Sequence, residues 1–374
     1  MAKNPSEILD QALVRASSDL SKPIVKNKTI RDRTEYVCRC LSNRAGVRLL
    51  MACLLAKIDR PKVDPRRPYT EIGEADSFSG RTYDESYITR FVNEHRLPCN
   101  PTTAFLTPAL RNISRPLTTD VEIVGRPRQL YTYTLQLLDD VHAGQVSAKD
   151  LLAEAIRHLL IMRDEKDGRM ATLLAGLKRS EDAIPLSSEA IVNLIEQHLA
   201  CKHSSRLPVL IVAAAYQAAG DKIGERLLPL ESHNAADEQT GAMGDLEICL
   251  VNDDQIVTAY EMKMKRVTID DIDRALQKIA TATARIHNYI FITTEVIEDP
   301  IKVYAVEAYE HTGGTEIAIL NCIGFLRHFL HFFHRLRIKY LNTYQALVLS
   351  EPDSAVSQPL KEAFLALRQA AEAD

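Results

Sequence analysis

Two carboxylates and one lysine near the middle of the second half of the chain have the types and spacing for metal-assisted chemistry. Asp245 begins an apolar run, a polar turn follows at residues 252–254, and a second run contains Glu261 and Lys263. Alternate residues of a strand share a face, so this glutamate and lysine are expected to lie side by side. Mg²⁺ takes one or two carboxylates from a protein, and a neighbouring ammonium can orient and help deprotonate an attacking water, or stabilise charge on a phosphate. The pattern predicts a Mg²⁺ site held by Asp245 and Glu261, with Lys263 acting on the attacking water.

The register of the predicted hairpin decides whether Asp245 joins the other two. If residues 252–254 form the loop, Val251 pairs with Gln255 and Asp245 lies directly across from Glu261. A loop that differs by two residues places Asp245 opposite the lysine instead, and an even-numbered loop sends it to the other face. The alternative for all three side chains is a solvated face with weak cross-strand ion pairs.

Glu247 is a further candidate for the same site. It shares the face of Asp245, so it is either a third metal ligand or a solvent-facing residue.

The segment around these residues alternates helical and extended patterns. Thr268 can cap a helix that runs to about residue 284, with Ile269, Ile272, Leu276 and Ile279 expected to face inward. The expected strands are residues 225–230, 245–251, 255–263 and 288–294. With helices before them, the predicted order is α, β, β, β, α, β, which is a mixed α/β sheet flanked by helices (α+β).

Length and composition indicate a folded, two-domain protein. The 374 residues carry 46 Lys+Arg and 50 Asp+Glu, a net charge of −4, so any polyanion contact needs a local basic surface. The start has no signal-peptide pattern and no stretch is apolar enough to span a membrane, so we expect a cytoplasmic protein. The seven cysteines are scattered, which indicates neither a disulfide framework nor a zinc site. His328, His331 and His334 alternate with Phe329, Phe332 and Phe333, which favours a packed or interface helix over a metal site.

Asp245 followed by Glu261-Met262-Lys263 on an apolar strand resembles the PD-(D/E)XK nuclease superfamily. The resemblance implies an αβββαβ restriction-endonuclease-like core and a Mg²⁺-dependent nuclease, which often draws another acid from the helix before the hairpin. The candidates for that acid are Glu189 and Glu196, two turns apart on a predicted helix, and Glu225 at a strand start. Spacing does not select among these three, and exposure at the surface is the default for each. Gly244 stands where the family motif carries proline.

A second stretch is similar to the N-terminal signature of SacI-family type II restriction endonucleases. It comprises residues 67–87, from Arg-Pro-Tyr-Thr-Glu-Ile-Gly-Glu-Ala-Asp to Tyr, and residues 97–112, from Leu-Pro-Cys-Asn to Arg-Asn. The resemblance implies a homodimer that cuts both strands of double-stranded DNA at a short palindrome, leaves 5′-phosphate and 3′-hydroxyl ends, and has a cognate DNA methyltransferase in its host. The alternatives are a structure-selective or repair nuclease of the same fold and a catalytically inactive DNA-binding protein.

On this basis three regions are predicted. Residues 1–180 form a mainly helical region for DNA contact and dimer support, residues 181–345 form the nuclease core, and residues 346–374 form a C-terminal tail. Candidate DNA contacts are polar residues of two loops and a basic run, with an ordinary loop or a solvated charged face as the alternative. They are Arg81, Tyr83, Asn234, Gln239, Lys26, Lys28, Arg31 and Arg33.

Overall fold

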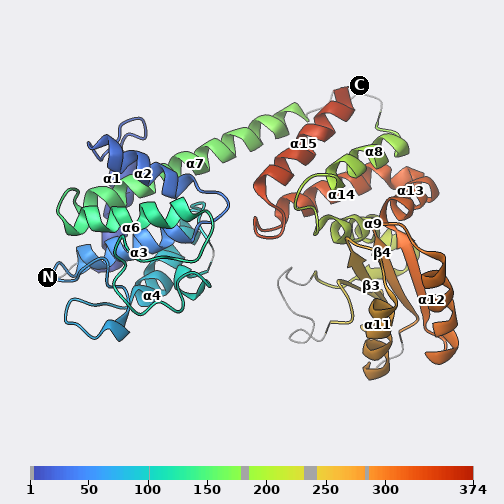
Figure 1. Ribbon diagram of the computed structural model, residues 1–374. Coiled ribbons are helices and arrows are strands. Elements are labelled where there is room, and N and C mark those ends of the chain that lie inside the picture. Colours follow the sequence, from blue (N-terminus) through green and yellow to red (C-terminus); the bar gives the residue numbers. More distant parts are fainter. Residues whose placement is uncertain (1–3, 101, 178–184, 231–241, 283–285, 374) are drawn as a thin grey trace. The chain divides into compact units, whose positions relative to one another are not determined.

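The computed structural model describes residues 4–100, 102–177, 185–230, 242–282 and 286–373 (Figure 1). The chain divides into two compact units, Met1–Arg169 and Met170–Asp374. Each unit has its own apolar core. No helix in the described ranges is long and apolar enough to cross a membrane.

The first unit is helical, as predicted for this half of the chain. Its central helix is α3, in which residues 45–56 are all buried, because the run is apolar on every side apart from Arg48. Long connections between the helices pack onto the same core. The helices are α1 (Pro5–Ser17), α2 (Lys28–Arg39), α3 (Ala45–Asp59), α4 (Gly80–Tyr83), α5 (Thr89–Glu94), α6 (Arg128–His142) and α7 (Ala148–Gly176), which ends in the second unit.

A buried ion pair organises the long connection after α3. Arg48 donates to Asp84 Oδ1 from Nε at 2.8 Å and from Nη2 at 2.5 Å. The other oxygen of Asp84 accepts from the Thr103 hydroxyl at 2.7 Å and from the Ala104 amide at 2.8 Å. Because every oxygen of this carboxylate is paired, the polar stretch between residues 67 and 110 can close over an apolar core.

The second unit is a mixed α/β domain, which confirms the predicted class. Its described residues form a five-stranded sheet in the order β1-β2-β3-β4-β5, with β1, β2 and β3 antiparallel and β3, β4 and β5 parallel. The strands are β1 (Glu225–Leu227), β2 (Leu246–Leu250), β3 (Ile256–Lys263), β4 (Asn288–Thr293) and β5 (Glu316–Asn321). The helices are α8 (Ser188–Leu199), α9 (Leu207–Ile223), α11 (Ile269–Thr281), α12 (Asp299–His311), α13 (Cys322–Phe332), α14 (Arg337–Ser350) and α15 (Gln358–Ala373).

The two faces of this sheet contact different helices. Tyr260 and Ile292 point to the face that packs on α8, α9, α13 and α14. Ala259, Tyr289 and Phe291 point to the other face, where α11 and α12 lie. Strand alternation therefore places Glu261 and Lys263 on the α11 side of the sheet.

Residues 346–374, which the sequence pattern set apart as a tail, are part of this domain. They form the end of α14 and the whole of α15, with Leu360 and Phe364 buried against α8. His198 on α8 has its Nε2 3.0 Å from the Leu360 carbonyl and its Nδ1 3.0 Å from the Tyr344 hydroxyl. The segment is a packed helix because its apolar residues recur at helical spacing.

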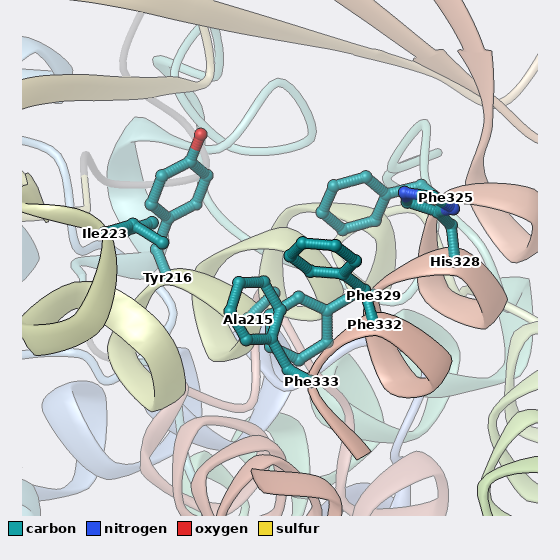
Figure 2. A pocket seen from close by; sticks show the side chains of 8 residues that line it. All are labelled: Ala215, Tyr216, Ile223, Phe325, His328, Phe329, Phe332 and Phe333. Carbon is teal, nitrogen blue, oxygen red and sulfur yellow. The ribbon is translucent and has the colours of Figure 1, made fainter. Parts of the chain in front are cut away.

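The histidine-rich stretch predicted as a packed or interface helix forms the end of α13, and its last histidine, His334, begins a short 3-10 helix (His334–Leu336). Phe329 and Phe333 are in contact with ring centroids 5.2 Å apart, and Phe332 is 71% exposed. These rings line an apolar hollow of about 290 Å³ between α9 and α13, on the sheet face opposite Glu261 (Figure 2). Its lining is Ala215, Tyr216, Ile223, Phe325, His328, Phe329, Phe332 and Phe333.

Candidate active site

The register of the β2–β3 hairpin brings Asp245 beside Glu261. Leu246 pairs with Tyr260 in this antiparallel hairpin. The next two opposed positions, toward the open end of the hairpin, are therefore Asp245 and Glu261. This is the register predicted from a three-residue loop. The pairing shifts by one residue between Ile248 and Cys249, which changes the turn end of the hairpin and leaves the site end as expected.

Gly244 allows the chain to approach β3 closely. A Cβ at this position would lie 2.5 Å from the Tyr260 carbonyl oxygen, so a side chain there would clash with backbone. This contact explains why a residue without a side chain stands at position 244. The next residue, Asp245, is exposed, and its Oδ2 accepts from the Met262 amide at 2.7 Å. The amide thus orients the carboxylate before any ligand is bound.

Glu261 and Lys263 form an ion pair on the α11 face of the sheet. The Lys263 Nζ lies 2.9 Å from Glu261 Oε1, and the two side chains are 16% and 17% exposed. The Tyr289 hydroxyl on β4 lies 3.2 Å from Glu261 Oε2 and 3.1 Å from the Met243 carbonyl. Since a hydroxyl has one proton, it donates to one of these acceptors at a time. The glutamate is restrained on both oxygens and still reaches the surface.

Helix α11 contributes two charged residues that the sequence pattern did not single out. Asp271 Oδ1 lies 3.3 Å from the Lys263 Nζ, and the Lys278 Nζ lies 3.6 Å from Glu261 Oε2. The two residues are seven apart and so face the same way on the helix. A signal for the first was present, because Thr268 and Asp271 have the spacing of a capping box, and the structure shows both of its hydrogen bonds.

The charges of this cluster reinforce one another. Burial disfavours the charged form of Lys263, but its contacts with Glu261 and Asp271 outweigh burial, so its pKa is raised above the ordinary value. Burial would likewise raise the pKa of Asp271, but hydrogen bonds from Thr268 and the nearby lysine lower it to about 2. At neutral pH the cluster therefore holds a protonated Lys263 next to an ionised Asp271.

The donor set suits a magnesium ion. Asp245 and Glu261 offer carboxylate oxygens, and Mg²⁺ usually keeps several waters and takes few protein ligands. Among the residues that the structure describes, no group of three or more His, Cys, Asp or Glu side chains is arranged to hold a metal ion. Asp245 and Glu261 are therefore the residues of this cluster that could supply carboxylate oxygens to such an ion.

Glu247 lies on the face of Asp245, as strand alternation predicted, but its carboxylate has another partner. Its Oε1 accepts from the Met243 amide at 2.7 Å, which supports the segment that leads into β2. The structure therefore gives Glu247 a structural contact beside the candidate site.

The three upstream glutamates lie elsewhere in the second unit. Glu189 contacts Arg327 at 3.2 Å and His331 at 2.8 Å on α13. Glu196 is exposed on α8. Burial raises the pKa of Glu225, which is hydrogen-bonded to Tyr216 on the α9 side of the sheet. The contacts of Glu189 and Glu225 are thus with helices other than α11.

The candidate DNA contacts differ in their exposure and partners. Tyr83 is buried and donates to Asp59 at 2.5 Å, so its ring is part of the first unit's core. Arg81 pairs with Glu85 at 2.8 Å. Asn234 and Gln239 lie outside the described residues.

The basic run lies before and along α2. Lys26 and Lys28 are exposed, and Arg31 is partly buried. Arg33 pairs with Asp140 at 3.1 Å. The two lysines are thus the members of the run with the greatest access to a polyanion.

Comparison with known proteins gives one family. Residues 184–295 match the SacI restriction endonuclease C-terminal domain. The matched segment contains Asp245, Glu261, Lys263 and both residues of α11 that contact them. No curated protein matches the chain. The resemblance to the SacI family seen in the sequence is therefore confirmed over residues 184–295.

Proposed function

We propose that the protein is a type II restriction endonuclease that hydrolyses double-stranded DNA at a specific sequence, depends on Mg²⁺, and leaves 5′-phosphate and 3′-hydroxyl ends. The observation that carries the proposal is the convergence of Asp245, Glu261 and Lys263 within the segment that matches the SacI domain. The order α9, β1, β2, β3, α11, β4 supports an αβββαβ core of the PD-(D/E)XK type.

In this proposal Asp245 and Glu261 hold the metal. Bound Mg²⁺ would polarise the scissile phosphate and make a coordinated water more acidic. The Met262 amide orients Asp245, and the Tyr289 hydroxyl restrains Glu261. These contacts reduce the reorganisation that binding of a cation requires.

Lys263 acts in its charged form. Contacts with Glu261 and Asp271 favour its ammonium form, and an ammonium suits orientation of the attacking water and stabilisation of the charge that develops on the phosphate. Lys278 adds a second cation next to Glu261.

A palindromic cut on both strands would use two copies of the chain. The host DNA would need protection by a methyltransferase.

Digestion of a plasmid of known sequence, with the ends mapped, tests the proposal. Mg²⁺ should give discrete fragments, and chelation of the metal should stop cleavage. Lys263→Ala should abolish cleavage and leave DNA affinity nearly unchanged. Lys265→Ala, an exposed lysine two residues further along, is the matched control and should cut at a rate within a few-fold of the parent.

Each alternative has its own outcome. Dependence on nicks, ends or mismatches would favour a repair nuclease. Specific binding without hydrolysis in Mg²⁺ or Mn²⁺ would favour an inactive DNA-binding protein. Cleavage by Lys263→Ala at the parent rate would remove this lysine from the mechanism.

A further inference from the structure

We propose that Asp271 is a positioning residue that holds Lys263 in place while Glu261 engages the metal. The inference rests on the proposed nuclease function and extends the site from the hairpin to the first turn of α11. It assigns Asp271 a role through the lysine, without contact with DNA or metal.

The two oxygens of Asp271 have separate partners. Oδ2 accepts from the Thr268 amide at 3.0 Å and from the Thr268 hydroxyl at 2.8 Å, which completes the capping box of α11. Oδ1 lies 3.3 Å from the Lys263 Nζ and 2.5 Å from Arg274 Nη2. The side chain is 1% exposed. The carboxylate is thus fixed by the helix on one side and contacts the lysine on the other.

Groups other than the lysine also favour the charged form of Asp271. The carboxylate lies in the first turn of α11, where exposed backbone amides and the helix dipole favour negative charge. Arg274 supplies a second cation on the same oxygen. Asp271 therefore remains an anionic partner for Lys263 when Glu261 binds a metal ion.

Binding of a metal ion at the proposed site would change the ion pairs of Lys263. Lys263 is held by Glu261 at 2.9 Å and by Asp271 at 3.3 Å. A cation bound to Glu261 competes with the ammonium for the same carboxylate, which weakens the first contact. Lysine is long and flexible, so without a second anchor its ammonium would leave the reacting phosphate. Asp271 is the anchor that does not change partner.

Four variants separate positioning from helix capping. Asp271→Asn keeps an acceptor for the Thr268 amide but removes the charge that holds Lys263. Asp271→Glu keeps the charge and suits the capping position. Thr268→Ala weakens the same cap and leaves the Asp271 carboxylate in place. Asp270→Asn removes an exposed acid from the same helical turn.

We expect Asp271→Asn to lower kcat for DNA cleavage by about 10–100-fold, the range found for partners that orient site residues, with KM nearly unchanged. Asp271→Glu should recover part of this loss. Thr268→Ala should lower the melting temperature to a similar degree as Asp271→Asn and keep kcat within a few-fold of the parent, and Asp270→Asn should change neither. Equal losses of kcat in Asp271→Asn and Thr268→Ala, or parent activity in Asp271→Asn, would overturn the proposal.

A double-mutant cycle on thermal unfolding decides the point without catalysis. Asp271→Asn and Lys263→Met should shift the melting temperature non-additively, whereas Asp270→Asn and Lys263→Met should be additive. If the parent protein fails to cleave DNA with Mg²⁺ or Mn²⁺, the nuclease proposal fails, and this cycle still reports whether Asp271 holds the lysine. Additive shifts for the first pair would refute the contact.

Discussion

The two units of this protein place paired charges in opposite environments. In the first unit Arg48 and Asp84 are both 0% exposed, and both oxygens of the aspartate are occupied by fixed partners. In the second unit Glu261 and Lys263 remain partly accessible. Besides each other, they contact Asp271, Lys278 and Tyr289. A charge enclosed on all sides cannot exchange partners, whereas one at the surface can accept a metal or a phosphate.

The contrast indicates which clusters are suited to structure and which to chemistry. Burying an ion pair costs desolvation and is sustained only when every group is hydrogen-bonded, so loss of one member leaves an uncompensated charge. A partly exposed cluster loses less solvation free energy, and its ion pairs contribute less to stability. The same residue types therefore carry a structural role in one unit and a candidate catalytic role in the other.

The largest effect on folding should come from Arg48→Met. This change leaves Asp84 buried without its cation, and we expect the free energy of unfolding of the first unit to fall by about 3–5 kcal/mol. Urea unfolding followed by circular dichroism measures it. Arg90→Met, which breaks an exposed pair with Glu94, is the control and should cost under about 1 kcal/mol. Similar losses for both variants would refute the distinction.

The largest effect on activity after loss of Lys263 should come from Glu261→Gln. Removal of the charge weakens metal binding and the hold on Lys263, so we expect DNA cleavage to fall by roughly 10²–10³-fold. Initial rates over a range of Mg²⁺ concentrations measure the change. Glu295→Gln, an exposed acid beyond the end of β4, should leave the rate within a few-fold. A parent-like Mg²⁺ dependence in Glu261→Gln would exclude this glutamate as a ligand.

A pH experiment sharpens the comparison, because the second unit also contains a fully enclosed titratable group. Burial lowers the pKa of His198 to about 4, below its ordinary value of about 6.5. Between these values the unfolded chain binds a proton that the folded chain does not, so stability is full above about pH 6.5 and falls as the pH drops toward 4. The loss should reach about 3 kcal/mol.

The contribution of His198 is isolated by comparing the parent with His198→Gln in urea unfolding from pH 7 to pH 4. Glutamine can accept from the Tyr344 hydroxyl and donate to the Leu360 carbonyl without titrating, so the variant should lose less stability over this range. Parallel pH curves would show that the histidine does not contribute.

The smallest expected effect is that of Lys278→Ala. Its Nζ is 3.6 Å from Glu261, beyond hydrogen-bond distance, and its side chain is 28% exposed, so we expect about a tenfold fall in cleavage rate. Arg274→Ala, on the same helix with a 60% exposed side chain, tests whether general positive charge on α11 accounts for the loss. Salt dependence of the rates measures the phosphate contribution of each residue.

Much of the candidate site follows from local rules. Strand alternation predicted the shared face of Glu261 and Lys263, and the hairpin register placed Asp245 beside them. Thr268 was predicted to start a helix and is the N-cap of α11. Local patterns predicted less reliably which side chains of a helix face the core, since Ile269 was expected to face inward and is 44% exposed. Helix α11 is rotated so that Asp271 and Ile272 are the buried residues of its first turn, which leaves Ile269 on the exposed side.

The rest of the site required the tertiary fold. Tyr289 reaches Glu261 because β4 pairs in parallel with β3, and the rotation of α11 brings Asp271 to Lys263. The partner strand β5 and helix α12 had not been predicted, and the deep burial of Tyr83 removed a candidate DNA contact from the surface. The sequence by itself determined which residues share a strand face, since that depends on a period of two. Only the tertiary structure decided which side chains from other elements complete the cluster, because those contacts depend on packing between segments far apart in the chain.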